Sequence, residues 1–331
     1  MKLSSDATRR KLLGAAAGIA IPAPLASPPT LANEPMRRRI ICPFAPGGIS
    51  DRISRVVAAE AQSRTGETWI VENIGGGGGL IGSLRAARSA PDGRTVVLAA
   101  TGVIRTLAGR VSRESDFDPL RDLRAIALIG ELPMLCVAQP SVAAPTLREY
   151  AEFLRSGRIP FAYASSGHAS TSHVIGAVIA QEHGLEVLHV PYAGAAPAVA
   201  ALLGGHVPCA IVDPMPVASM LSTGSLRALG VSSSTRHSRL PHIATIAELG
   251  FQRAALTSWT GFLVAAATPK TVLAMLGQVL SEIMRSDSVR NTLDECFIEG
   301  PHVFGDEAQS SVTEDARTFQ QMMADTGIVL S

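Results

Sequence analysis

The sequence uses one layout twice: IICPFAPGGISD at residues 40–51 and FAYASSGHASTSH at residues 161–173. In each stretch a short β-rich run leads into a loop of small residues, and an apolar helical pattern follows. Strands that alternate with helices in this way are typical of an α/β protein. The loop is a favourable place for an anion, because the helix behind it begins with backbone N–H groups that lack acceptors.

The same alternation continues along the chain and predicts the α/β fold class. Another helix is expected to start at Pro269, as a first-turn proline, and to run to Met284. The predicted strands are residues 39–44, 69–72, 95–100, 125–129, 134–138, 161–164, 187–190, 210–212, 226–231 and 261–265.

The length of the chain favours two domains. The residues that follow position 32 exceed what one hydrophobic core usually organises. No long polar linker is present, so we expect the chain to cross between domains in extended segments near residues 131–138 and 257–262. The sequence therefore predicts domain 1 from residues 33–134 and 259–331, and domain 2 from residues 135–258.

The first 32 residues have the composition of an export signal. Arg9 and Arg10 precede an apolar run that is roughly half the ~20 residues of a membrane-spanning helix. The paired arginines favour twin-arginine export, and an ordinary secretory signal is the alternative. We expect cleavage after Ala32 and a periplasmic protein.

The charge balance excludes several classes of partner. The chain has 29 basic and 28 acidic residues, and removal of residues 1–32 leaves 25 and 27. This near-neutral balance provides no field that attracts nucleic acid or an anionic membrane. Aromatic residues make up only 4%, which argues against a stacking surface for bases. An anion site must therefore be built locally.

The cysteines and histidines show no spacing that is typical of metal ligands. Cys42, Cys136, Cys209 and Cys296 lie far apart without a CxxC pair, and the eight histidines contain no HExxH motif. We expect no metal site. The cysteines are interpreted as small buried side chains, with a long-range disulfide as the alternative.

A glycine run resembles the fingerprint of a dinucleotide site. Gly77, Gly79 and Gly82 match GxGxxG after a predicted strand, but the next strand, residues 95–100, ends without the required ribose-binding acid. We therefore expect no cofactor. A flexible, close-packed connection near the ligand site is the preferred use of these glycines, and a nucleotide-dependent α/β enzyme remains an alternative.

The first loop is suited to hold a carboxylate. Gly47 and Gly48 allow the backbone to approach a ligand closely, and the N–H groups of the next helix carry partial positive charge. Ser50 or Asp51 is expected to cap that helix; for Asp51, a polar contact to the ligand is the alternative. The predicted site residues here are Phe44, Ala45, Gly47, Gly48, Ser50 and Asp51.

The second loop is the richest group of hydroxyl donors in the sequence. Its predicted site residues are Ser165, Ser166, Gly167, Ser170 and Thr171. The alternatives are a solvated turn with Thr171 or Ser172 as the helix cap, and a Ser–His nucleophile pair. Because no G-x-S-x-G motif accompanies the pair, we expect no catalytic residues.

Two further candidates lie at predicted strand ends, where α/β proteins bind ligands. Tyr192 precedes a small-residue turn into a helix, and Asp213 follows the strand at residues 210–212. The alternative for Asp213 is to cap the turn around Pro214 and Pro216.

Taken together, these motifs resemble the receptors of tripartite tricarboxylate transporters, the Bug or TctC-like solute-binding proteins. The resemblance covers the chain beyond the export signal. Its landmarks are residues 43–48 with Asp51, and residues 71–73, 91–93, 163–167, 189–192, 194–198, 202–205, 226–229 and 258–259.

The resemblance implies a two-lobed periplasmic-binding-protein fold (type II-like), with two α/β domains that close on a ligand between them. It implies a monomeric receptor without enzymatic activity, which delivers a small carboxylate to membrane transporter subunits. The loop through Gly47, Gly48 and Asp51 would hold the ligand from one lobe, and residues 165–171 from the other, with Asp213 beside it. A sensor that binds a ligand in the same fold is the alternative.

Four departures from the family pattern concern the ligand. His168-Ala169 replace Asn-Gly, Leu80 replaces Asn, Ala193 replaces Lys, and Pro214-Met215 replace Asn-Leu. The loss of amides and of a cation leaves a less polar site, which favours a smaller or partly aromatic monoacid over citrate.

Overall fold

The computed structural model describes residues 37–109, 117–168 and 170–326. The chain divides into two units, Met1–Glu34 and Pro35–Ser331, and the described residues all belong to the second. The predicted export signal and its cleavage site after Ala32 lie outside the described residues.

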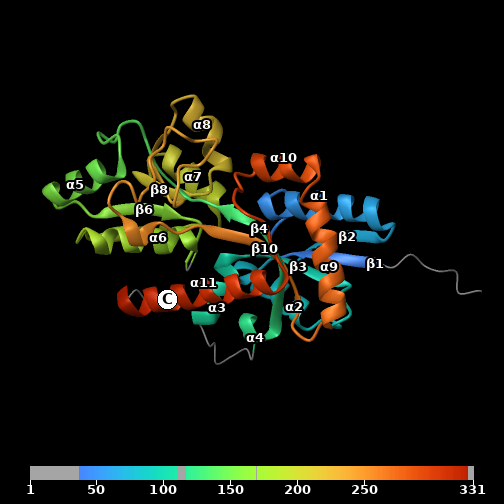
Figure 1. Ribbon diagram of the computed structural model, residues 1–331. Coiled ribbons are helices and arrows are strands. Elements are labelled where there is room, and N and C mark those ends of the chain that lie inside the picture. The colour runs from blue at the N-terminus through green and yellow to red at the C-terminus, as the bar shows by residue number, and fades with distance from the viewer. Residues whose placement is uncertain (1–36, 110–116, 169, 327–331) are drawn as a thin grey trace, which may run out of the picture. The chain divides into compact units, whose positions relative to one another are not determined.

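Sheet 1 contains six strands in the order β11-β4-β10-β3-β1-β2. Figure 1 labels β1, β2, β3, β4 and β10 of this sheet. Strands β1, β2 and β3 run parallel, whereas β10 is antiparallel to β3 and β4. The strands are β1 (Arg37–Cys42), β2 (Thr68–Asn73), β3 (Thr95–Ala100), β4 (Leu123–Leu132), β10 (Ser258–Ala265) and β11 (Val303–Phe304).

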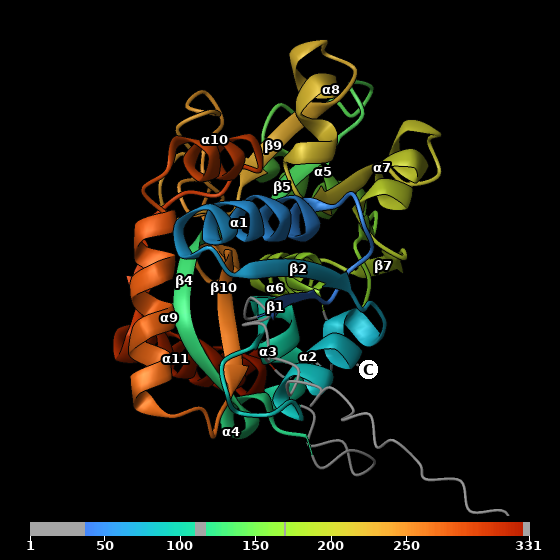
Figure 2. The same cartoon turned by 90° about the vertical axis from the view of Figure 1, so that its right-hand side faces the viewer.

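Helices cover both faces of sheet 1, because successive side chains of a strand point to opposite faces. Ile40 joins the core that contains Ile53 of α1, whereas Ile41 joins the core of Ile104 and Val312. Figure 2 shows α1 on one side of β1 and β2, and α2 and α3 on the other. The helices are α1 (Ile49–Thr65), α2 (Leu80–Ala87), α3 (Thr101–Gly109), α4 (Pro119–Asp122), α9 (Lys270–Ile283), α10 (Asp287–Glu295) and α11 (Gly305–Thr326).

Sheet 2 contains five strands in the order β7-β6-β8-β5-β9. Strands β7, β6 and β8 are parallel, and β5 is antiparallel to β8 and β9. The strands are β5 (Leu135–Ala138), β6 (Phe161–Ser165), β7 (Val187–Pro191), β8 (Cys209–Val212) and β9 (Arg227–Val231). The helices are α5 (Leu147–Gly157), α6 (Thr171–Glu182), α7 (Ala195–Leu203) and α8 (Ala218–Ser222).

The predicted α/β fold class is confirmed, and each predicted strand overlaps one of β1 to β10. The sequence analysis missed β11, which has two residues. It also placed Pro269 one position too far into its helix. Pro269 has an extended backbone (φ −60°, ψ 145°) and is the N-cap of α9, so the helix starts at Lys270.

Two chain segments connect the sheets, between Leu132 and Leu135 and between Val231 and Ser258. The segments are hydrogen-bonded to each other: Met134 N donates to Ser232 Oγ (2.8 Å), and Ser232 N donates to Met134 O (2.9 Å). The division into two domains at residues 134 and 258 stays a prediction.

All four cysteines are free and buried. Cys136 of β5 and Cys209 of β8 bring their Sγ atoms to 3.4 Å, a contact between thiols. Their interpretation as small buried side chains is confirmed, and no long-range disulfide is formed in this structure.

Candidate functional site

The loop after β1 leads into a helix without a side-chain cap. Gly48, with an extended backbone (φ −81°, ψ 177°), is the N-cap of α1. The prediction that Ser50 or Asp51 caps the helix is wrong, because both residues lie inside its first turn. No acceptor among the described residues is found for the N–H groups of Ile49 and Ser50. These donors are free to bind an anion.

Asp51 holds this loop in place from within the helix. Its carboxylate accepts hydrogen bonds from Gly47 N (3.0 Å), Arg55 Nε (3.0 Å) and Asn73 Nδ2 (2.9 Å). The hydrogen bond from Arg55 is the main reason why the pKa of Asp51 falls to about 2. Asn73 also donates to Phe44 O (3.2 Å). Asp51, which is 4% exposed, therefore fixes the loop at Gly47 directly and at Phe44 through Asn73.

The glycine run packs closely beside this loop. A Cβ atom on Gly79 would lie 2.6 Å from Val103 Cγ2 and 3.4 Å from Phe44 Cζ. One on Gly82 would lie 2.7 Å from the carbonyl oxygen of Ile74. The predicted close packing is confirmed at Gly79 and Gly82, and the flexibility of the connection stays a prediction.

The loop after β6 is held together by its own hydroxyl groups. Ser170 is the N-cap of α6, and its Oγ accepts from His173 N (3.2 Å) and donates to Gly167 O (2.7 Å). The alternative cap at Thr171 or Ser172 is wrong, because both lie in the first turn of the helix. Only Ser170 has the extended backbone (φ −68°, ψ 158°) that a cap requires.

The two serines that end β6 have different surroundings. Ser165 is 0% exposed, and its Oγ lies 2.6 Å from His189 Nε2. A nucleophilic role is not supported, because this hydroxyl has no exposed surface and no carboxylate among the described residues is bonded to His189. Ser166 N donates to Ser172 Oγ (3.1 Å), whereas no partner is found for Ser166 Oγ in the described part of the chain. The half-exposed Ser166 hydroxyl is thus available to a ligand.

Tyr192 and Asp213 lie at the same edge of sheet 2 as this loop. The carboxyl ends of the parallel strands β7, β6 and β8 share one edge, and the two residues directly follow β7 and β8. Tyr192 N donates to Ser165 O (3.1 Å). Gly167 has φ +129°, and a Cβ atom there would lie 3.2 Å from Tyr192 O. The fold therefore brings together the predicted site residues of this sheet.

Asp213 is a carboxyl group without a charged partner. Burial raises its pKa from 3.8 to about 6. Within residues 37–109, 117–168 and 170–326, no hydrogen bond or ion pair of its side chain is found. A protonated Asp213 can donate a hydrogen bond to a carboxylate, whereas the ionised form repels one.

One contact connects the surroundings of the two loops. Arg52 Nη1 of α1 lies 3.9 Å from Sδ of Met215, in the turn that follows Asp213. The first turn of α1 and the carboxyl end of β8 are therefore neighbours.

Two surface hollows lie elsewhere. One, of about 710 Å³, is lined by α1 and β2 residues that include Gln62 and Trp69. The other, of about 430 Å³, includes Thr146, Arg227 and Ile243. Neither contains a predicted site residue. We place the candidate site at the two loops, because the free amides and hydroxyls gather there.

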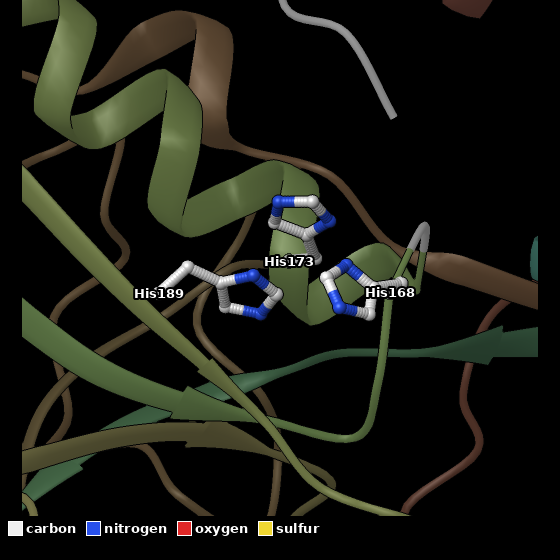
Figure 3. Close-up of side chains that lie close together, drawn as sticks. All are labelled: His168, His173 and His189. Carbon is white, nitrogen blue, oxygen red and sulfur yellow. The ribbon is translucent and has the colours of Figure 1, made fainter. Parts of the chain in front are cut away.

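Three histidines lie close together at the second loop. The spacing of the histidines in the sequence did not indicate this group. His168, His173 and His189 have ring nitrogens within 4.8 Å of one another (Figure 3). The rings of His173 and His189 are stacked, with centroids 3.8 Å apart and an angle of 6° between planes. Burial lowers the pKa of each of these two histidines to about 4, so both are neutral at pH 7.

A family model described as the tripartite tricarboxylate transporter family receptor matches residues 53–324. The chain belongs to this receptor family. Like the other members, this TctC-type receptor is a solute-binding protein and not an enzyme.

Relatives of the TctC-type receptor match it over most of their length. It is 30% identical to protein BugT of Bordetella pertussis over 275 residues, which cover 83% of each chain. The structure of periplasmic binding protein BugD matches with a TM-score of 0.75 and 26% identity, over 88% of this chain and 98% of that one. These matches confirm the periplasmic-binding-protein fold.

A third match is a structure with adipate. The structure "R. palustris Rpa4515 with adipate" is 25% identical, has a TM-score of 0.79, and covers 92% of this receptor and 99% of its own chain. Among the described residues of the TctC-type receptor, no helix combines the length and the apolar character that a bilayer span requires.

Proposed function

We propose that this receptor captures a small carboxylate in the periplasm and delivers it to the membrane subunits of a tripartite tricarboxylate-type transporter. The observation that carries the proposal is a pair of strand-to-helix loops with free donors, the amides of Ile49 and Ser50 and the hydroxyl of Ser166. The adipate that the description of Rpa4515 names supports a carboxylate as the ligand class. A processed monomer, cleaved after Ala32, is part of the same proposal.

The ligand is held from both sheets. Its carboxylate accepts hydrogen bonds from the first-turn amides of α1, and the hydroxyl and amide groups around Ser166 bind it from the other side. The proposed site comprises Phe44, Ala45, Gly47, Gly48, Ser50, Asp51, Ser165, Ser166, Gly167, Ser170, Thr171, Tyr192 and Asp213. Among these, Asp51, Ser165 and Ser170 act mainly on the shape of the loops, because their side chains are already bonded within them.

The donors suffice without a lysine or arginine. Micromolar binding corresponds to about 8 kcal/mol. Each hydrogen bond to a charged group contributes about 1.5–3 kcal/mol, so four or five donors reach this value before ordering costs. Because donors from both sheets bind the ligand only when they are close together, the ligand favours the closed form of the receptor.

A thermal-shift screen of organic acids and amino acids tests this proposal. A ligand present at roughly 100 times its Kd stabilises the folded receptor by about 2.7 kcal/mol and raises Tm. We expect Gly48→Val and Ser166→Ala to abolish the shift. Both variants keep the unliganded Tm, because a Cβ atom on Gly48 meets nothing closer than 3.8 Å and its backbone suits any residue.

Gly277→Val is the matched control. Gly277 lies in α9, where an added Cβ atom would meet no neighbouring atom within 4 Å, and it lies far from both loops along the chain. This variant keeps the ligand-induced shift. An unchanged shift in both Gly48→Val and Ser166→Ala contradicts the proposed site.

A further inference from the structure

Three segments contribute the histidines at the edge of sheet 2. His168 lies in the exposed part of the loop after β6, His173 in the first turn of α6, and His189 in β7. The parallel pairing of β6 and β7 places His189 beside the start of α6, and Figure 3 shows the three rings close together. The rings of His168 and His189 are nearly perpendicular, at 89°.

A hydrogen bond to Ser165 orients the ring of His189. The hydroxyl of Ser165 has a single hydrogen, with His189 Nε2 at 2.6 Å and Gly167 O at 3.1 Å as neighbours. When that hydrogen goes to Gly167 O, His189 Nε2–H donates to Ser165 Oγ and Nδ1 keeps its lone pair. Metal-bound histidines usually have their second nitrogen fixed in this way.

We propose that His168, His173 and His189 bind one divalent transition-metal ion of the zinc class. Imidazole nitrogen is a preferred ligand for Zn²⁺, Ni²⁺ and Cu²⁺, and hard cations such as Mg²⁺ prefer oxygen.

Binding requires a small rearrangement of the rings. The lone pairs of two parallel rings lie in two parallel planes, whereas both must point at one ion about 2.0–2.1 Å away. One ring of the His173–His189 stack therefore turns about its side-chain torsions. His168 is exposed, so its side chain can turn toward the same point without disturbing the core.

A bound ion would also supply a positive charge for the ligand carboxylate. Neither loop, residues 43–51 or 165–173, contains lysine or arginine. Three histidines leave the fourth position of a tetrahedral ion open, and a carboxylate oxygen can fill it. This last step rests on the proposed function, whereas metal binding itself does not.

Zinc chloride titrated into the tag-free full-length chain, previously treated with EDTA and dialysed, tests the metal site. We expect one equivalent to bind by calorimetry at pH 7.5, and magnesium chloride to give no binding. His168→Asn should weaken zinc binding by at least about tenfold, and its exposed position keeps the fold intact. His189→Gln should do the same, with folding checked by circular dichroism.

His206→Asn and His242→Asn are matched controls, because both residues are exposed and lie outside the group. They should leave zinc affinity unchanged. The proposal is overturned if the wild-type chain binds no stoichiometric zinc, or if His168→Asn binds it as tightly as the wild type does. The visible absorption of bound Co²⁺ gives an independent readout, since a tetrahedral site has an intense spectrum that His168→Asn should lose.

The thermal-shift screen, repeated with EDTA and with added zinc, separates the two proposals. A carboxylate that stabilises the receptor only with zinc supports the fourth-position role. A shift that is equal in EDTA keeps the proposed function and removes the metal from ligand binding. Zinc binding without any carboxylate hit keeps the metal site and counts against the proposed function.

Discussion

Asp213 and Asp51 show how position decides the charge of a carboxyl group. Asp51 accepts three hydrogen bonds and has a pKa of about 2, so it is ionised at any pH near neutral. Asp213 is desolvated without a partner, and its pKa rises to about 6. Asp51 therefore acts as a permanent acceptor that shapes the first loop, whereas Asp213 changes charge close to physiological pH.

Ligand binding should strengthen as the pH falls. Between pH 7.5 and 5.5, Asp213 takes up a proton, which removes its repulsion of the ligand carboxylate and provides a hydrogen-bond donor. We expect a severalfold lower Kd at pH 5.5 by calorimetry. Asp213→Asn should bind with little pH dependence over this range, and a variant with the wild-type slope would show that another group is responsible.

The same proton uptake affects folding with a definite sign. The pKa of Asp213 is higher in the folded chain than the ordinary 3.8, so the folded chain holds this proton more tightly. Its contribution to the free energy of unfolding is fully present below pH 3.8 and is lost as the pH rises through about 6. The stabilisation by Asp51 has the opposite sign: it is present above pH 3.8 and is lost as the pH falls through about 2.

At the scale of elements, the sequence predicted the strand-to-helix units better than their caps. Short apolar runs between the helical patterns predicted ten strands, because a strand that is buried on both faces is almost continuously apolar. The cap depends on which residue has an extended backbone, and the neighbouring hydroxyls in residues 170–172 do not reveal that. The caps are Gly48 and Ser170, each one step before the first helical residue.

The histidine group shows a second limit of the sequence. His168 and His173 are five residues apart, and His189 belongs to another strand. Only the pairing of β6 with β7 brings them together, so a search for close spacing could not find them. The two loops were identified as candidates because glycines and hydroxyls occur there in contiguous runs.

Gly82 and Gly102 form a matched pair for testing close packing between elements. A Cβ atom on Gly82 would lie 2.7 Å from Ile74 O and 2.8 Å from Pro43 Cβ, whereas Gly102 has no atom within 4 Å. We expect Gly82→Ala to lower the free energy of unfolding by roughly 1–3 kcal/mol. Gly102→Ala should leave it unchanged or raise it by up to about 1 kcal/mol, since alanine favours a helix.

Chemical denaturation of both variants measures the difference. Both glycines are in helices, α2 and α3, so the intrinsic helix preference of alanine is the same in each case. Equal stabilities would mean that α2 can shift away from β1 and β2 at little cost.

At the scale of the whole molecule, the proposed function requires the two sheets to approach when a ligand binds. We expect a small decrease in the radius of gyration by small-angle X-ray scattering when the best carboxylate from the screen is added. The Ser166→Ala variant, which keeps the fold but loses a donor, should show no decrease. A radius that stays constant in the wild type at saturating ligand would contradict closure.

The segments that connect the sheets limit where such a motion can occur. On one side, Ser232 Oγ accepts from Met134 N and donates to Leu256 O (2.6 Å). On the other side, Thr257 Oγ1 donates to Glu131 Oε2 (2.7 Å). The two connecting segments are thus hydrogen-bonded to each other on both sides of a very short stretch. This stretch contains Pro133, which has no N–H to donate. We therefore expect any opening to pivot about this stretch, with each sheet and its helices moving as a rigid body.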